Sequence, residues 1–252
     1  MSFREEPIFF KTENLSKAFG GVQAVYRVGL EIERGDICAL IGPNGAGKST
    51  FFNLVTKYFE PDEGRVFFKG EDITRLAPQE ICKRGIARSF QKVNIYPKLT
   101  VFQSVQMSLL SQKGKGLKLF RSAKSMFREE TYEILNQVGL SDHADRIGDA
   151  LSHGDKKRLE VAITLGNEPE LMLMDEPTAG MAPEETTATM ELIGRLAEQR
   201  GLTVFFTEHD MSVVFGISKK IIVLHQGSII CQGKPEEIRA NEQVQKVYLG
   251  EE

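Results

Sequence analysis

The chain has 252 residues, of which 41% are hydrophobic and 27% charged, and its net charge is −3. A chain of this length can bury a core without disulfides or structural metals, and so small a net charge excludes bulk attraction to nucleic acid or anionic lipid. Cys38, Cys82 and Cys231 are too far apart for a disulfide framework or a structural zinc site, which predicts reduced thiols in the cytoplasm. Because the sequence has no signal peptide and no apolar run that could span a bilayer, we expect a protein that is soluble by itself.

Short β-rich runs alternate with helical patterns along the chain, which predicts a doubly wound α/β sheet. The first two runs, 8–15 and 27–32, alternate apolar with polar residues and suit a flanking antiparallel layer. The apolar runs at 36–41 and 171–175 suit central parallel strands that are buried on both faces. The other runs are 65–70, 203–207, 220–225 and 228–233.

Helical periodicity replaces the strand pattern in the middle of the chain, at 101–110 and 129–140. We therefore expect a single domain in which residues 100–151 form an inserted helical subdomain. Residues 1–99 and 152–252 are expected to form the core, with its β layer.

The sequence GPNGAGKST, residues 42–50, follows the apolar run at 36–41 and begins a helix near Lys48. It has the Walker A spacing of Gly, four residues, Gly, Lys and Ser. Its glycines let backbone amides turn toward a β-phosphate at a helix N-terminus. We expect Lys48 to reach the β- and γ-phosphates and Ser49 to bind Mg²⁺. A dinucleotide site is excluded because the glycine spacing is not Gly-x-Gly-x-x-Gly.

Asp175 and Glu176 end the apolar run at 171–175 and precede Pro177. Adjacent strand residues point to opposite faces, but the chain bends where a strand ends, so both carboxylates can face one cleft. Asp175 is expected to orient Mg²⁺, and Glu176 to act as general base on the attacking water. A solvated turn before proline is the alternative, and the phosphate-binding loop upstream argues against it.

Three further side chains are candidates for the same cleft. His209 follows the run at 203–207 and could donate a hydrogen bond to a γ-phosphate, although a lone histidine at a strand end is often a turn or core residue. Gln91 follows a short strand and precedes the helical segment, where it could sense Mg²⁺ or the water. Phe19 precedes two glycines, and its ring could either stack on adenine or anchor the core.

The sequence LSHGDKKRLE, residues 151–160, begins like a helix that holds an anion. Ser152 can cap the helix, Gly154 offers a bare backbone, and three cations follow. A capping box formed by Ser152 and Asp155 explains the same residues without any ligand.

In this order, the segments GPNGAGKST, SFQ, LSHGDKKRLEVA, LMLMDEPTAGM and TEHDM resemble the nucleotide-binding domain of ATP-binding cassette (ABC) proteins, over essentially the whole chain. The resemblance implies a P-loop NTPase with a RecA-like core, an antiparallel β layer and a helical subdomain, and it implies ATP and Mg²⁺ as cofactors. The implied nucleotide contacts are Gly42, Asn44, Gly45, Ala46, Gly47, Lys48, Ser49, Thr50, Ser152 and Gly154. The implied catalytic residues are Lys48, Gln91, Glu176 and His209, and the implied metal ligands are Ser49, Gln91 and Asp175.

The resemblance also implies a head-to-tail dimer, in which Ser152 and the Gly154 amide face a γ-phosphate held by the second subunit. ATP binding would close the dimer, and hydrolysis would open it and drive membrane subunits docked beside Gln91. The sequence departs from the family pattern in two places. His153 and Asp155 replace a Gly and the Gln of the usual Leu-Ser-Gly-Gly-Gln signature. In the D-loop, Ala182 replaces the usual Asp, which puts one contact between subunits in doubt.

Within this family, FNLVTKYFEPDEGRVFFKGEDIT, GIARSFQ, DEPTAGMAPEE and the C-terminal sequence resemble the ATP-binding subunit of branched-chain amino acid importers. Urea and amide importers look similar. A non-transport ABC ATPase usually has two cassettes or a long coiled coil, and a small-molecule kinase needs an acceptor pocket and a lid that the sequence does not show.

The implied partners are a second copy or a paralogous ATP-binding subunit, the permease subunits and, indirectly, a solute-binding protein, but no nucleic acid. The implied location is the cytoplasmic face of the inner membrane. Near Gln91, we expect apolar Val93, Ile95 and Tyr96 to be exposed unless a partner covers them. The basic segment 113–128 could contact lipid head groups or a partner, or simply be a solvated connector.

Overall fold

The computed structural model describes residues 8–89, 95–113 and 126–249. The strands in these ranges are β1 (Phe10–Phe19), β2 (Val22–Ile32), β3 (Ile37–Ile41), β4 (Glu63–Phe68), β5 (Glu71–Asp72), β6 (Ile86–Ser89), β7 (Leu171–Asp175), β8 (Thr203–Thr207), β9 (Lys220–His225) and β10 (Ser228–Gly233). The α-helices are α1 (Lys48–Val55), α2 (Pro78–Lys83), α3 (Val101–Gln112), α4 (Arg128–Gln137), α5 (His153–Leu165), α6 (Pro183–Arg200), α7 (Met211–Ile217), α8 (Pro235–Arg239) and α9 (Glu242–Leu249). None of these helices is both long and apolar enough to cross a membrane.

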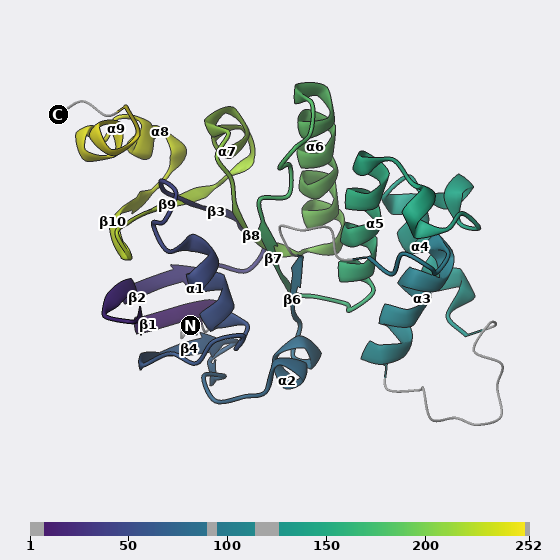
Figure 1. Cartoon of the computed structure of the whole chain (residues 1–252), viewed down its shortest axis with the longest axis horizontal. Helices are drawn as coiled ribbons and strands as arrows, with labels where there is room; N and C mark the ends of the chain where they lie inside the picture. Colours follow the sequence, from purple (N-terminus) through teal and green to yellow (C-terminus); the bar gives the residue numbers. More distant parts are fainter. Residues whose placement is uncertain (1–7, 90–94, 114–125, 250–252) are drawn as a thin grey trace, which may run out of the picture.

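The strands form two sheets (Figure 1). The six-stranded sheet has the order β10-β9-β3-β8-β7-β6, in which all neighbours are parallel except β10, which is antiparallel to β9. The four-stranded sheet, β2-β1-β4-β5, is antiparallel throughout. The prediction of a parallel sheet with a flanking antiparallel layer is therefore confirmed. The run at 65–70 contributes β4 to the antiparallel layer.

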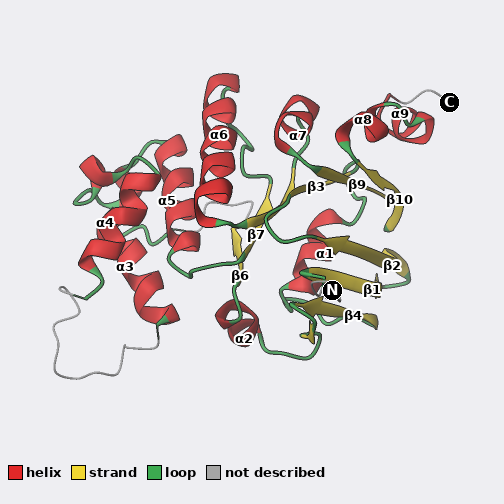
Figure 2. Cartoon of the chain, turned by 180° about the vertical axis from the view of Figure 1, so that it is seen from behind, coloured by secondary structure: helices red, strands yellow, loops and turns green. Residues whose placement is uncertain are grey.

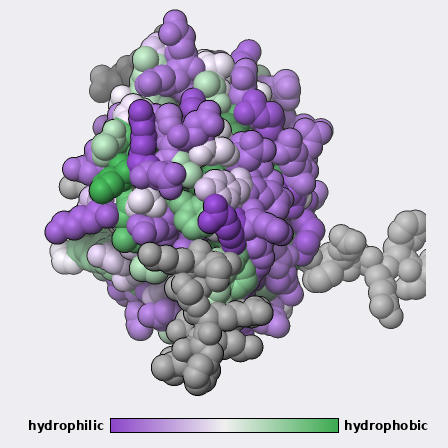
Figure 3. All heavy atoms as spheres, turned by 90° about the vertical axis from the view of Figure 1, so that its right-hand side faces the viewer, coloured by the Kyte–Doolittle hydropathy of each residue, from purple (hydrophilic) through white to green (hydrophobic). Residues whose placement is uncertain are grey.

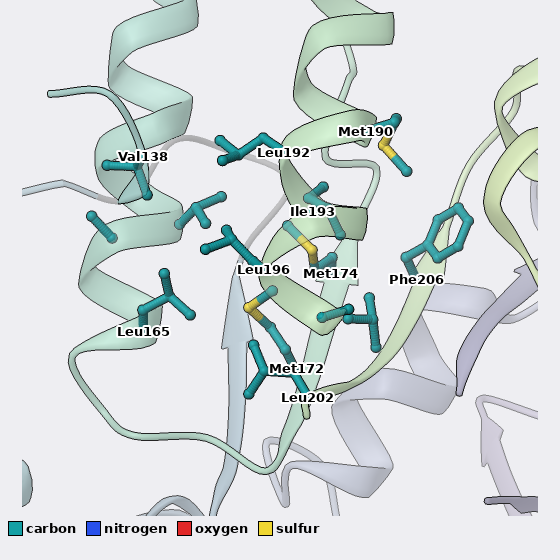
Figure 4. Close-up of a cluster of buried hydrophobic side chains, with 14 of the residues drawn as sticks. Val138, Leu165, Met172, Met174, Met190, Leu192, Ile193, Leu196, Leu202 and Phe206 are labelled. Carbon is teal, nitrogen blue, oxygen red and sulfur yellow. The ribbon is translucent and has the colours of Figure 1, made fainter. Parts of the chain in front are cut away.

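Alternate residues of the central strands face two separate hydrophobic cores. On β7, Met172 and Met174 pack with the helices α5 and α6 (Figure 4). Leu171 and Leu173 belong to the second core, which includes the antiparallel layer and α1. There the Phe205 ring of β8 lies 5.2 Å and 6.0 Å from the two phenylalanine rings of α1. Burial on both faces explains why these strands are apolar at nearly every position.

Helices α3 and α4 lie within the segment that the sequence predicts to be helical, and α5 packs against both. Thr100 caps α3: its hydroxyl accepts the Gln103 N–H at 3.1 Å, while the Gln103 side chain accepts the Thr100 N–H at 3.0 Å. The second helix ends earlier than the predicted residue 140, because the chain turns at Gly139 with φ of 72°. Figure 2 shows these three helices together at one end of the molecule.

The loop before α3 differs from its sequence prediction. Tyr96 is exposed, as expected, but Ile95 is partly buried and packs on the core of the helical end, so its predicted exposure is wrong. The loop passes close to Gly148, where a Cβ would lie 3.2 Å from the Tyr96 carbonyl oxygen and 3.4 Å from Ile95 Cδ1. Val93 and most of the basic segment 113–128 lie outside the described residues.

A buried ion pair lies at the carboxyl end of the parallel sheet. Arg88 of β6 donates to Asp175 of β7 at 2.9 Å, and the two side chains are only 7% and 4% exposed. The guanidinium also donates to Asn53 of α1 at 2.6 Å. Burial lowers the pKa of Arg88, and the Asp175 carboxylate opposes that shift. Arg88 and Asp175 therefore join β6, β7 and α1 through two charges that are almost completely buried.

Replacing Arg88 with methionine should lower the free energy of unfolding by about 3–5 kcal/mol, because it leaves the buried Asp175 carboxylate without its charged partner. The same replacement at Arg84, which pairs with Glu71 at 3.2 Å with side chains 39% and 68% exposed, should cost about 1 kcal/mol or less. Urea unfolding without nucleotide measures both changes. Equal losses in the two variants would contradict a stabilising role for the buried pair.

Candidate functional site

The predicted phosphate-binding loop connects the end of β3 to the start of α1. The helix begins at Lys48, as the sequence predicts, after Gly47 with φ of 103°. A Cβ on Gly47 would collide with the carbonyl oxygen of Ala24 in β2, so both the conformation and the space require glycine. No side chain caps the N-terminus of α1. Its first amides are therefore available to an anion.

The ammonium group of Lys48 lies back across this loop. It donates to the carbonyl oxygens of Gly42 at 2.7 Å and Pro43 at 3.2 Å. Burial lowers the pKa of Lys48, and the nearby Glu176 and Asp175 carboxylates oppose that shift. A phosphate oxygen would offer this cation a charged acceptor in place of neutral carbonyls, which is the stronger kind of hydrogen bond.

Asp175 lies at the carboxyl end of β7 and is held on both of its oxygens. One oxygen accepts the Thr207 hydroxyl at 2.8 Å and lies 3.4 Å from the Ser49 hydroxyl. The other oxygen accepts from Arg88. Ser49 and Asp175 therefore meet, although they are distant in sequence. A hydroxyl beside a carboxylate suits Mg²⁺, which takes one or two protein oxygens together with phosphates and water.

Glu176 and His209, which were predicted separately, lie side by side in the structure. Glu176 has φ of 51°, so the chain bends at the end of β7 as predicted. Its amide donates to the backbone and side-chain oxygens of Thr207 at 3.1 Å and 3.0 Å. Its carboxylate lies 2.8 Å from His209 Nε2. A carboxylate oriented in this way, near Lys48 and the candidate Mg²⁺ ligands, can accept a proton from a water.

The N-terminus of α5 contains the predicted signature residues. The Ser152 hydroxyl accepts the Asp155 N–H at 3.1 Å and lies 2.9 Å from the Asp155 carboxylate, so it caps the helix. A Cβ on Gly154 would lie 3.4 Å from Glu185 Oε1 of α6. In both cartoon views, α5 lies on the far side of β6 and β7 from α1 (Figures 1 and 2). The structure therefore separates the signature helix from the phosphate-binding loop of its own chain.

Two predicted residues stand apart from this cluster. Phe19 ends β1 with 41% of its surface exposed, and its ring packs edge-on against Phe59 at 5.2 Å. This exposure argues against a core anchor and leaves the stacking role as the prediction. Gln91 lies outside the described residues.

Sequence reasoning missed residues that complete the site. Arg88 binds Asp175, Thr207 binds both acidic residues, and Glu208 binds the turn after Glu176. The available signals were an arginine within the short run Ile86–Ser89 and an acidic residue directly before His209. Neither signal identifies Asp175 as the partner of Arg88 or Thr178 as the partner of Glu208, because both partners are distant in sequence.

Comparisons with known proteins identify the family of the chain. Residues 25–179 match the family described as ABC transporter, and residues 228–252 match the family described as branched-chain amino acid ATP-binding cassette transporter. The chain is 38% identical over 244 residues to the high-affinity branched-chain amino acid transport ATP-binding protein LivG of Escherichia coli (strain K12), covering 94% of this chain and 96% of LivG. The corresponding protein BraF of Pseudomonas aeruginosa is 36% identical over 248 residues, which cover 96% of this chain and 97% of BraF.

Solved structures are similar over almost the same length. A nucleotide-free ATP-binding cassette from an ABC transporter matches with a TM-score of 0.83 and 31% identity, covering 97% of this chain and 100% of that one. The ADP conformation of the cassette MJ1267 matches with a TM-score of 0.82 and 29% identity, covering 97% of this chain and 99% of that one. The predicted P-loop NTPase fold with a RecA-like core is thus confirmed, and the chain belongs to the ABC transporter family of ATP-binding cassettes.

Proposed function

We propose that the chain is the ATP-hydrolysing subunit of an ABC importer for branched-chain or other hydrophobic amino acids. The observation that carries the ATPase assignment is the meeting of Ser49 with Asp175 and of Glu176 with His209 at one edge of the sheet. The importer assignment rests on the similarity to LivG and BraF and on the match at residues 228–252.

In this proposal, each side chain acts on the nucleotide from its place in the fold. Lys48 moves from the loop carbonyls to the β- and γ-phosphates, and the loop amides bind the phosphate oxygens. Ser49 and Asp175 would hold Mg²⁺, which would supply positive charge against the charge that develops on the phosphate. Glu176 takes a proton from the attacking water while His209 contacts the γ-phosphate. Gln91 is proposed to bind Mg²⁺ or this water, and Phe19 to stack on adenine.

The second half of each site is proposed to come from another copy or from a paralogous subunit. Ser152 and the Gly154 amide would face the γ-phosphate bound by the partner. The separation of α5 from α1 within one chain supports this arrangement, and a similar cassette, MJ0796, has been solved as a dimer. In the signature of this chain, the Ser152 hydroxyl donates to Asp155 and must leave it to bind phosphate.

The end of the molecule formed by α3, α4 and α5 is the proposed contact with the permease subunits. We propose residues 100–151 as the helical subdomain and residues 1–99 and 152–252 as the core. Tyr96, Met107 and Ile147 are between 45% and 49% exposed. Figure 3 shows this end of the molecule, whose surface is mainly hydrophilic with smaller hydrophobic patches. Permease subunits would cover these three side chains and place the chain at the cytoplasmic face of the inner membrane, with a solute-binding protein on the other side.

Other solutes remain alternatives, since the nucleotide site does not contact the solute. A phosphonates import ATP-binding protein of Synechococcus is also 36% identical to this chain over 231 residues. A urea or amide importer is the closest alternative, and a non-transport ABC ATPase is the more distant one.

A Glu176→Gln variant can test whether each ATP site is shared between two subunits. Loss of the base should block hydrolysis and trap ATP in a closed dimer, which size-exclusion chromatography with ATP detects. Adding Ser152→Arg should abolish that dimer and leave ATP binding intact, because the phosphate-binding loop of the same chain is unchanged.

Loss of the dimer separates a phosphate-binding role of Ser152 from its role as a helix cap. Loss of the cap alone would lower stability by about 1 kcal/mol and preserve the dimer. A double mutant that still dimerises with ATP, or that stays folded yet fails to bind ATP, would contradict the shared site.

The solute is tested on the complex purified from cells through a tag on this chain. With its solute-binding protein in proteoliposomes, the complex should raise ATP turnover when leucine or valine is added, whereas urea and phosphonate should have no effect. Stimulation by urea alone would assign the chain to a urea importer instead.

A further inference from the structure

A buried carboxylate that the proposed mechanism does not use lies beside the catalytic pair. Glu208 follows β8 directly, precedes His209 and is only 4% exposed. One of its oxygens accepts both the N–H and the hydroxyl of Thr178, at 2.9 Å and 2.6 Å. The other oxygen accepts the N–H of His209 at 3.2 Å. Burying a carboxylate costs free energy unless hydrogen-bond donors satisfy it. Here donors face both oxygens, so position 208 requires a side chain with two acceptor oxygens.

Together with the Glu176–His209 contact, these bonds link the turn after β7 to the turn after β8 in a closed ring. Thr178 lies two residues after Glu176, in the turn that leaves β7, while Glu208 and His209 lie in the turn that leaves β8. The Glu176 carboxylate contacts His209 at 2.8 Å, and Glu208 bridges the same two turns from the other side. Each turn is therefore tied to the other at two places beyond the ends of the strands.

The strands themselves do not need this bridge. β7 and β8 are already paired from Leu171 with Thr203 to Asp175 with Thr207, and the Glu176 amide is bound by Thr207. What the ladder leaves undetermined is the path of the two turns after Asp175 and Thr207. Glu208 fixes that path, because it is bound to one turn and belongs to the other.

We infer that Glu208 is a positioning residue for ATP hydrolysis: it sets the place of His209 relative to Glu176 by joining the His209 turn to Thr178. This inference rests on the proposed roles of Glu176 and His209. The hydrogen bonds of Glu208 go to Thr178 and His209, and neither residue belongs to the phosphate-binding loop. Loss of the bridge should therefore slow hydrolysis and leave ATP binding nearly unchanged.

The bridge has a second consequence for the turn after β7. Beyond Thr178 the chain reaches Gly180, where a Cβ would lie 3.8 Å from Nε2 of His153 in the signature helix. The turn that Glu208 bridges therefore runs close to the signature helix, which is the helix proposed to face the neighbouring ATP site. Displacing Thr178 would therefore disturb both the position of His209 and the segment beside the signature helix.

The direct test replaces Glu208 with glutamine in the full chain. The amide has one acceptor oxygen, so its NH₂ group must face either the two donors of Thr178 or the N–H of His209, and one side of the bridge is lost. Steady-state ATPase assays should show kcat lower by about tenfold, the value of one charge-assisted hydrogen bond, with KM for ATP within about twofold of wild type. Glu184→Gln, at an exposed position of α6, is the matched control and should change neither constant.

Thr178 tests the other side of the bridge by a milder change. Thr178→Val removes the hydroxyl donor and should lower kcat with KM preserved, whereas Thr178→Ser keeps the donor and should restore kcat to near the wild-type value. This pair decides the question even if Glu208→Gln fails to fold. Thermal unfolding of each variant identifies that case.

Three results would overturn the inference. They are an unchanged kcat in folded Glu208→Gln, a KM that rises while kcat is kept, and a Thr178→Ser variant as slow as Thr178→Val. Failure of the proposed function has a separate signature, because Glu176→Gln would then retain turnover. Measuring Glu176→Gln in the same assay therefore tells the two failures apart.

Discussion

The buried carboxylate of Asp175 is the group on which the rest of the site depends. A charge at this depth is unstable without partners, and the fold supplies them from three other elements: Arg88 from β6, Ser49 from α1 and Thr207 from β8. Satisfying one carboxylate thus brings the phosphate-binding loop, the edge strand and the end of β8 to a common point. Glu176 and His209 directly follow the strand ends that meet there, and the Glu208 bridge between their two turns helps to set their positions.

The two hydrophobic cores make this convergence rigid. Because alternate residues of β7 and β8 pack into opposite cores, neither strand can shift its register without moving apolar side chains out of both. The carboxyl ends of the strands are therefore held in register, and the polar residues that follow them inherit fixed positions. The turns beyond the ladder have no such support, which is why side-chain bonds such as those of Glu208 matter there.

The sequence predicted those parts of the site whose chemistry is local. Gly47, Lys48 and Ser49 lie in one loop whose spacing defines their geometry, and the apolar run before Asp175 predicts a strand end. Arg88, Thr207 and Glu208 were missed because their partners lie 87, 32 and 30 residues away, and only the strand order places them together.

Two other outcomes show the same limit. Ile95 was expected to be exposed because nothing in its own segment shows that it packs against a hydrophobic core built from distant residues. The run at 65–70 could belong to either sheet until its pairing with β1 placed it in the antiparallel layer. In both cases the contact that decides the outcome is with a distant part of the chain, which local composition does not show.

The most direct test of this account is the effect of Mg²⁺ on ATP affinity, measured by titration with Mg²⁺ or with EDTA. The wild-type chain should bind ATP more tightly with Mg²⁺. Asp175→Asn should lose that gain, and so should Ser49→Ala, which leaves the ion pair with Arg88 intact. Both variants should still bind ATP in EDTA through the loop amides and Lys48. If both variants kept the full Mg²⁺-dependent gain, the meeting of Ser49 and Asp175 would not be the metal site, and the central claim would be wrong.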